Sequence, residues 1–320
     1  VLGRGDEVPD AVERDLRHIM GRLDADGRWH LFGMTGPDEY TTVVNDNLFT
    51  NVMARYNMRV AAEWIERLHD VEENYFEEMV RRLHLRPEEP EEWRKAADAM
   101  YIPFDDEHGI HPQDAHFLER EVWNKGQEQP KRPLLLHYHP LTIYRYQVIK
   151  QADVVLALFL RGSEFSEKAR RADFDYYDPL TTGDSSLSSV VQCIVAAELG
   201  YDAHAQELFR HAVYVDLCNL HGNSSDGLHI ASCGGVWSAL VFGFGGLRDY
   251  DGRWTIDPVL PEKWECMRYR VQLRGSRLRV EVRPDEVELE CDSAVEMPLE
   301  VWGQSVSLKA GQKCVVKKPK

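Results

Sequence analysis

The chain has 320 residues, of which 43% are apolar and 29% are charged, and its formal net charge is −16. Such a chain can bury a sizeable core in one large domain or two smaller ones. The acidic balance argues against nucleic acid as a partner, because nucleic-acid binding needs clustered lysines and arginines. No apolar run approaches the roughly 18 residues of a membrane span, so no membrane is expected as a partner either.

The six cysteines lie far apart, without the spacing of a metal site. We therefore interpret them as reduced thiols of a cytoplasmic protein and expect no bound metal. The first residues, Val1–Asp10, lack the apolar stretch of a signal peptide. Because the chain begins with Val rather than Met, we expect it to be a fragment or a truncated form.

Residues 46–246 show the apolar periodicity of successive helices, punctuated by glycines and prolines. The expected helices cover residues 46–68, 71–83, part of 91–100, 142–161, 163–172, 185–200, 203–220 and 227–241. The helix at 227–241 is apolar nearly all round, so we expect it to be buried. The segment 103–140 is aromatic and His-rich without clear periodicity, which predicts a long loop over a pocket.

After Gly245-Gly246 the pattern changes to short segments that often alternate apolar and charged residues. This period of two is typical of an antiparallel sheet with one face in water. The segments are residues 268–273, 278–283, 287–291, 299–302, 306–308 and 314–316. We place a boundary near 249–257 and expect a helical domain over 1–250 and a small antiparallel β-sandwich over 251–320.

The pentapeptide Gly36-Pro37-Asp38-Glu39-Tyr40 places two carboxylates on a turn that leads into the helix at 46–68. Pro37 fixes its own φ and so stiffens the turn. A carboxylate that such a turn holds and partly removes from water is suited to general acid catalysis. The residues alone leave a second interpretation open, in which Asp38 and Glu39 only cap the helix.

Three further motifs follow in order: Lys150–Val154 (KQADV), Thr181–Ser188 (TTGDSSLS) and Asp226–Gly235 (DGLHIASCGG). With the pentapeptide ahead of them, they resemble the catalytic half of glycoside hydrolase family 65, from about residue 27 to about residue 246. That family contains inverting maltose, trehalose and kojibiose phosphorylases and a smaller set of hydrolases. The resemblance implies an (α/α)6 barrel, which is expected to be incomplete here because fewer than twelve helices are visible.

By the same resemblance Glu39 is the catalytic acid, which protonates the departing glycosidic oxygen. Lys150 and Gln151, expected in the middle of the helix at 142–161, hold the non-reducing glucose. The alternative for Lys150 is a solvated side chain on the wet face of that helix.

Inorganic phosphate is expected as co-substrate, and no cofactor is expected. Its binding residues by resemblance are Ser185, Ser186, His229, Ser232 and Gly234. The first two are expected to open a helix whose free amides can cradle an anion. His229 is expected in the first turn of the helix at 227–241, on one face with Ser232. The alternatives are that Asp184 or Ser185 is merely an N-cap and that His229 is a satisfied core histidine.

Two positions depart from the family pattern. Gly183 stands where family phosphorylases usually carry His and where family hydrolases carry a carboxylate nearby as base. Asp184 is then the nearest substitute base. Thr41 stands where the family commonly has His, which could alter the aglycone side of the pocket.

The leading expectation is an inverting α-glucoside phosphorylase that cleaves an α-linked glucose disaccharide with phosphate to β-glucose 1-phosphate. The second is an inverting α-glucosidase that uses water, and the third is a non-catalytic fragment that needs its missing half. The linkage, among maltose, trehalose, kojibiose and nigerose, is left open. The oligomeric state is also open, although the family is often homodimeric.

Overall fold

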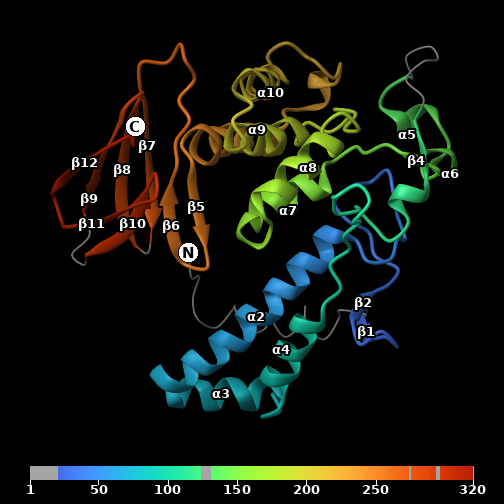
Figure 1. The fold of residues 1–320 in the computed structure, drawn as a ribbon, viewed down its shortest axis with the longest axis horizontal. Helices are drawn as coiled ribbons and strands as arrows, with labels where there is room; N and C mark the ends of the chain where they lie inside the picture. Colours follow the sequence, from blue (N-terminus) through green and yellow to red (C-terminus); the bar gives the residue numbers. More distant parts are fainter. Residues whose placement is uncertain (1–20, 124–130, 274, 293–295, 320) are drawn as a thin grey trace. The chain divides into compact units, whose positions relative to one another are not determined.

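The computed structural model describes residues 21–123, 131–273, 275–292 and 296–319. Its contacts group the chain into two compact units, residues 2–149 and residues 150–320, which are described separately (Figure 1). Helices dominate up to residue 246 and strands follow, so the expected order of a helical region and a β-sheet region is confirmed. The first strand of the sheet region, β5, begins at Leu247. The domain division at 250/251 stays a prediction.

The first unit combines three long helices with short elements. Its elements are β1 Gly21–Leu23, β2 Trp29–Leu31, α2 Leu48–Val71, α3 Glu73–Leu83, α4 Glu89–Ala99, η1 Phe117–Glu119, β3 Glu121–Val122, α5 Leu134–His137, α6 Pro140–Ile143 and β4 Tyr146–Gln147. The predicted helices at 46–68, 71–83 and 91–100 are confirmed, with shifted ends. Helix α2 begins after Asn47, whose side chain accepts a hydrogen bond from the Thr50 amide.

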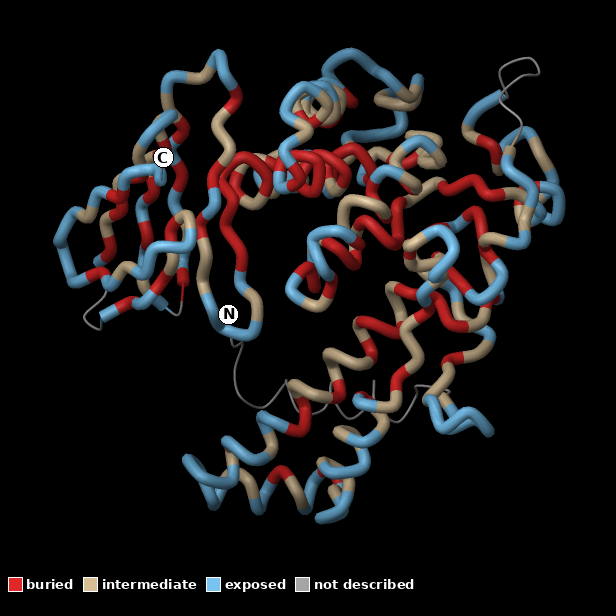
Figure 2. The backbone as a smooth tube through the Cα atoms, viewed as in Figure 1, coloured by how far each residue is buried: buried red, intermediate tan, exposed pale blue. Residues whose placement is uncertain are grey.

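One hydrophobic core cluster of this unit lies where α2 meets α4 and β2, and another surrounds Tyr40. Five buried residues form the first cluster: Leu31, Ala54, Met58, Ala97 and Met100. Residues 63–78, the far half of α2 and the start of α3, carry no buried residue (Figure 2). The region that matters for the candidate site is therefore the packed beginning of α2.

The predicted helix at 142–161 is confirmed only over 153–160, where α7 lies, and is wrong for its first half, because the chain is extended at Tyr146-Gln147 and bends at 150–151. Tyr146-Gln147 pairs in parallel with Glu121-Val122. The buried Gln147 side chain donates hydrogen bonds to the carbonyls of Leu118 and Arg120, at 3.2 and 2.8 Å. These partners are distant in sequence and override the local helical periodicity.

The second unit begins with helices arranged around α9. They are α7 Asp153–Leu160, η2 Gly162–Glu164, α8 Glu167–Tyr177, α9 Ser188–Glu198, α10 Asp202–Tyr214, η3 Ser224–Asp226, α11 Ile230–Ser238 and the π-helical turn η4 Ala239–Phe244. Nearly all of α9 is buried, and α7, α10, α11 and η4 all contact it. A Cβ at Gly235 would lie 2.8 Å from Val190 Cγ2, so glycine allows α11 to approach α9 closely.

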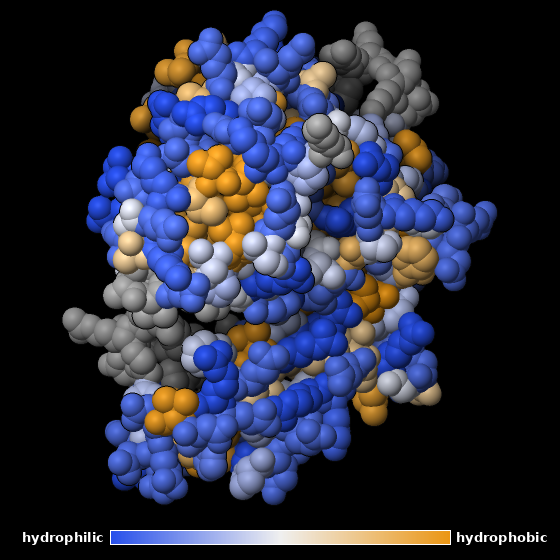
Figure 3. Space-filling model, turned by 60° about the vertical axis from the view of Figure 1, so that its left-hand side comes forward, coloured by the Kyte–Doolittle hydropathy of each residue, from blue (hydrophilic) through white to orange (hydrophobic). Residues whose placement is uncertain are grey.

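The expectation that the helix at 227–241 is buried is wrong for residues 227–238, up to the end of α11. Ile230 is 70% exposed and Trp237 47%, and within α11 only Ser232 is buried. The apolar pattern predicts burial only where neighbours cover every side, and the described helices cover one side. Apolar side chains also gather into a patch on the face of the molecule seen in Figure 3.

Two four-stranded sheets complete the second unit, with the orders β11-β10-β6-β5 and β12-β9-β8-β7. Their strands are β5 Leu247–Tyr250, β6 Arg253–Ile256, β7 Met267–Leu273, β8 Ser276–Arg283, β9 Glu286–Cys291, β10 Met297–Val301, β11 Gln304–Leu308 and β12 Lys313–Lys317. The pairing is antiparallel except between β10 and β6, so the wholly antiparallel arrangement expected is wrong for that pair. On β8, Leu278, Val280 and Val282 are buried and alternate with charged residues, as predicted.

Candidate active site

The turn Gly36–Tyr40 buries the side chains on both sides of Glu39. Asp38 is 1% exposed and Tyr40 is fully buried, whereas Glu39 is exposed. The Asp38 carboxylate accepts hydrogen bonds from the Tyr40 amide (3.2 Å) and from Gln113 Nε2 (3.1 Å). The Tyr40 hydroxyl accepts one from the Leu134 amide at 2.9 Å. The backbone at Glu39 is thus anchored on both sides, and its side chain lies at the surface.

Two expectations about this turn are wrong. The cap of α2 is Asn47, so the interpretation in which Asp38 and Glu39 only cap that helix does not hold. The partial removal of Glu39 from water is not found either, because the described residues leave this side chain exposed.

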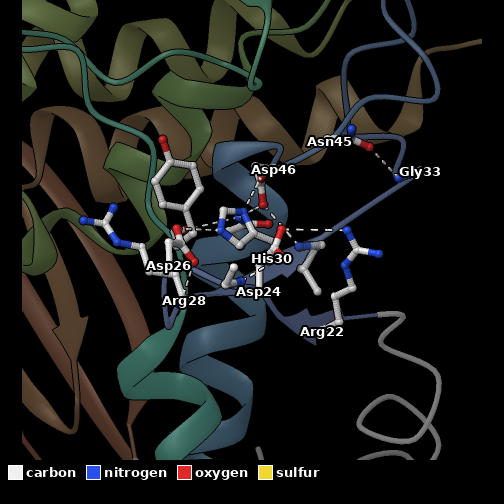
Figure 4. A network of polar contacts seen from close by, with 12 residues as sticks. Arg22, Asp24, Asp26, Arg28, His30, Gly33, Asn45 and Asp46 are labelled. Carbon is white, nitrogen blue, oxygen red and sulfur yellow. Dashed lines mark hydrogen bonds and ion pairs between the residues drawn. The ribbon is translucent and has the colours of Figure 1, made fainter.

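The base of the loop that carries Glu39 is closed by backbone pairing and by a partly buried contact between His30 and Asp46. Met34 and Val44 exchange two backbone hydrogen bonds, at 2.8 and 2.9 Å. Just beyond them His30 Nδ1 lies 2.8 Å from Asp46 Oδ2, and His30 Nε2 lies 3.2 Å from Asp26 Oδ2 (Figure 4). Burial lowers the pKa of His30, but the hydrogen bonds to Asp46 and Asp26 outweigh it and raise the pKa above its ordinary value. The imidazole thus joins two carboxylates next to the loop.

Lys150 and Gln151 lie in a bend before α7, not in the middle of a helix as expected. The Lys150 carbonyl accepts a hydrogen bond from Ser188 Oγ at 2.8 Å. The side-chain nitrogen Nε2 of Gln151 donates a hydrogen bond to Ser185 Oγ at 3.3 Å. The two polar residues therefore do not interrupt an apolar helix, and their bend is tied to the segment that precedes α9.

Ser185 and Ser186 lie before α9 rather than opening it, since the helix begins at Ser188. Leu187 occupies the N-cap position, and no side-chain hydrogen bond in the described structure caps the helix there. Ser185 Oγ instead accepts from the Leu187 amide at 3.3 Å, which closes a tight turn ahead of the helix. The interpretation of Asp184 or Ser185 as the N-cap itself is therefore wrong.

Gly183 adopts φ +73°, in the left-handed region that glycine enters without strain. A Cβ at this position would meet nothing within 4 Å. The left-handed backbone conformation, and not crowding by neighbouring atoms, therefore favours glycine at this position.

His229 is the N-cap residue of α11 and precedes the first turn in which it was expected. Its backbone amide donates to Asp216 Oδ2 at 2.8 Å, and its ring Nδ1 lies 2.6 Å from Asp216 Oδ1. These contacts hold His229 outside helical geometry. Its side chain is 24% exposed, so the alternative of a satisfied core histidine does not fit.

Ser232 and Gly234 lie within α11 and differ in exposure. Ser232 is fully buried, and its hydroxyl donates to the Ser186 carbonyl at 3.0 Å. Gly234 is exposed. The structure thus connects Gln151 to Ser185 and Ser186 to Ser232, so three of the four motifs meet around the start of α9. Glu39 belongs to the other compact unit, and its placement in the same pocket stays a prediction.

Two residues that the sequence motifs do not mark, Asp216 and His221, lie next to His229. Asp216 stands in the turns after α10 and meets His229 across a loop of 13 positions, and no motif marks this spacing. The His221 ring lies 5.9 Å from that of His229. Burial, together with repulsion from His211 and His229, lowers the pKa of His221.

In the described parts of the chain, no group of three or more His, Cys, Asp or Glu side chains is arranged to hold a metal ion. Among the same residues, no helix combines the length and apolar character needed to cross a membrane.

Two family models match the chain. The glycosyl hydrolase family 65 central catalytic domain matches residues 18–238, and the C-terminal domain of the same family matches residues 247–308. Both assigned segments agree with the observed change from helices to strands.

The chain is also similar to individual proteins. An alpha,alpha-trehalose phosphorylase of Geobacillus stearothermophilus is 43% identical over 285 residues, which cover 88% of this chain and 37% of the relative. A kojibiose phosphorylase of Halothermothrix orenii is 35% identical over 82% of this chain and 34% of the relative. A solved structure provisionally assigned as a kojibiose phosphorylase from the human microbiome has a TM-score of 0.84 at 25% identity, over 98% of this chain and 46% of that chain. This chain spans less than half the length of each.

Proposed function

Because this chain belongs to glycosyl hydrolase family 65, we propose that it carries the catalytic machinery of an inverting α-glucoside phosphorylase. The protein would cleave an α-linked glucose disaccharide with inorganic phosphate, giving β-glucose 1-phosphate and a free sugar. The likeness to a trehalose phosphorylase and a kojibiose phosphorylase supports phosphorolysis.

The observation that carries this proposal is the junction before α9. Gln151 of the proposed glucose-binding pair contacts Ser185 of the proposed phosphate segment, 3.3 Å apart. Ser186 is tied in turn to Ser232 at 3.0 Å. In a displacement at the anomeric carbon, sugar and nucleophile must lie side by side, so binding groups for both are needed in contact.

The reaction needs one acid and one nucleophile. Glu39 gives its proton to the glycosidic oxygen as the bond from that oxygen to C1 breaks. A phosphate oxygen attacks C1 from the opposite face and forms the new C1–O bond, which inverts the configuration from α to β. Ser185, Ser186, His229, Ser232 and Gly234 are proposed to form the phosphate site, and Lys150 and Gln151 to hold the glucose.

Gly183 favours phosphate over water as the nucleophile. An inverting hydrolase needs a carboxylate base roughly 6.5–9.5 Å from its acid, with room for a water between them. Gly183 offers no side chain for this role, and Asp184 is the nearest substitute. Phosphate needs no base because it is itself the nucleophile.

The proposal extends to the fold, the domain division, the location and the assembly of the protein. The helices are proposed to belong to an (α/α)6 barrel, for which the likeness to the solved structure is the support. We further propose a helical region over 1–250, a sheet region over 251–320, and a cytoplasmic enzyme that works without a cofactor. A homodimer is the assembly expected from the family.

The test is sugar release by the purified protein from trehalose, kojibiose, maltose and nigerose, with and without phosphate. Cleavage that requires phosphate supports the proposal, and the preferred sugar identifies the linkage. Equal cleavage without phosphate would favour the α-glucosidase. No cleavage under either condition would favour a chain that is not catalytic by itself.

A further inference from the structure

His229 is held by one carboxylate through two contacts. Asp216 accepts a hydrogen bond from the His229 amide at 2.8 Å on one oxygen, and lies 2.6 Å from the ring Nδ1 on the other. Backbone and side chain of His229 are therefore fixed together. These two contacts with Asp216 set the orientation of the imidazole ring at the start of α11.

Asp216 is suited to this role because it stays ionised. Hydrogen bonds from the side chain and the backbone amide of His229 hold the pKa of Asp216 below its usual range. An ionised carboxylate can only accept hydrogen bonds, so the proton between the two groups must lie on Nδ1. The second ring nitrogen, Nε2, is then the one that can serve a ligand.

The second ring nitrogen, Nε2, is held by a longer contact than Nδ1. The side-chain nitrogen of Asn223 lies 3.4 Å from Nε2, which is long for a hydrogen bond, so a ligand can replace this contact. The His229 side chain is 24% exposed, against 10% for Asp216. The partly exposed ring is thus fixed at Nδ1 by a short contact with Asp216 and held at Nε2 only by a long one.

We propose that Asp216 is a positioning residue for phosphate binding, because it fixes His229 with Nδ1 as donor and presents Nε2 to the anion. This rests on the proposed function. A neutral ring accepts at Nε2 from the hydroxyl of hydrogen phosphate, and a protonated ring donates from Nε2 to a phosphate oxygen. Both forms use the same nitrogen, so the arrangement serves either state.

The test compares Asp216→Asn with the unchanged protein. Asn can offer its own N–H to Nδ1, which selects the other tautomer while keeping the side-chain shape. The dissociation constant for inorganic phosphate, measured by calorimetry, should rise roughly tenfold or more, as expected for the loss of one charged hydrogen-bond partner. Where turnover is measurable, the KM for phosphate should rise and the KM for the disaccharide should not. Asp202→Asn, at an exposed acid on α10 outside the motifs, is the matched control and should change neither.

Nitrogen NMR of the unchanged protein gives a readout that does not depend on the variant folding. The His229 signals, assigned with His229→Gln, should show a protonated Nδ1, and phosphate should shift Nε2 more than Nδ1. Phosphate binding unaltered by Asp216→Asn, or an unprotonated Nδ1 in the unchanged protein, would overturn the role of Asp216. A protein that shows the Nδ1 proton but binds no phosphate would instead overturn the proposed function.

Discussion

Gln113 Nε2 lies 3.1 Å from the buried carboxylate of Asp38, and this contact ties the loop that carries Glu39 to a segment 75 positions further along the chain. The loop is therefore held by the interior of its unit while the acid itself lies at the surface. A catalytic acid must keep its position when substrate arrives, and buried neighbours on both sides provide that fixation.

Replacing Glu39 with Gln should abolish most turnover and leave the fold intact. Gln keeps the shape but has no proton to give, and general acid catalysis contributes roughly 10²–10⁴-fold. The rate of disaccharide cleavage and the thermal unfolding of both proteins check this. Glu63→Gln, an exposed acid on α2, serves as control and should keep full activity. A Glu39→Gln protein with most of its rate would show that another group is the acid.

The His30–Asp46 pair should make stability depend on pH. The pKa of His30 is raised in the folded protein, so its stabilising contribution is fully present below the unfolded pKa, about 6.5. The contribution is lost as the pH rises through the higher folded value. His30→Gln should therefore be destabilised more at pH 5.5 than at pH 9, as measured by urea unfolding. His137→Gln, at an exposed histidine on α5, is the matched control. A His30→Gln effect equal at both pH values would contradict a charged His30.

Phosphate should protect Cys233 from alkylation. This thiol is exposed on α11 between Ser232 and Gly234, whereas Cys218 is exposed outside the proposed phosphate residues. At a phosphate concentration about ten times the Kd, labelling of Cys233 should slow roughly tenfold, by mass action. Cys218 is the internal control, and mass spectrometry of peptides gives both rates. Cys193 should not react in the folded protein, because burial raises its pKa to about 12. Equal labelling of Cys233 with and without phosphate would show that α11 does not contribute to phosphate binding.

Gly246→Ala should destabilise the protein where the chain enters β5. Gly246 has φ +63°, and an added Cβ would lie 2.1 Å from the Asp257 carbonyl oxygen. Gly303 has a similar φ of +71° but nothing within 4 Å, so Gly303→Ala measures backbone strain alone. The free energy of unfolding should fall by about 1 kcal/mol or more for both and by a larger amount for Gly246→Ala. Equal losses would show that the contact with Asp257 relaxes without cost.

The sequence predicts elements well where local signals decide them. Helix α2 is found within a few residues because its apolar period is regular, and the structure adds the cap at Asn47. Strands β7 to β12 are found because one face is wet and the other is buried, as on β8, whereas β5 and β6 were not predicted. The order of the four motifs also indicates the family, which the family models confirm.

The sequence fails where distant partners decide the conformation. The bend at Lys150-Gln151 follows the pairing of Tyr146-Gln147 with Glu121-Val122, which no local pattern reveals. The exposure of α11 depends on which neighbours cover it, and an apolar pattern does not contain that information. The contact of His229 with Asp216 spans 13 positions of a loop, so the sequence pattern did not predict that Asp216 contacts His229.

The most direct measurement of phosphorolysis is proton and phosphorus NMR of the preferred disaccharide during turnover, at several phosphate concentrations. We expect the signals of β-glucose 1-phosphate to appear from the first time points, at a rate that rises with phosphate and then saturates. Without phosphate we expect no glucose release above background. Free glucose formed at a rate independent of phosphate would contradict phosphate as the nucleophile and would identify water in its place.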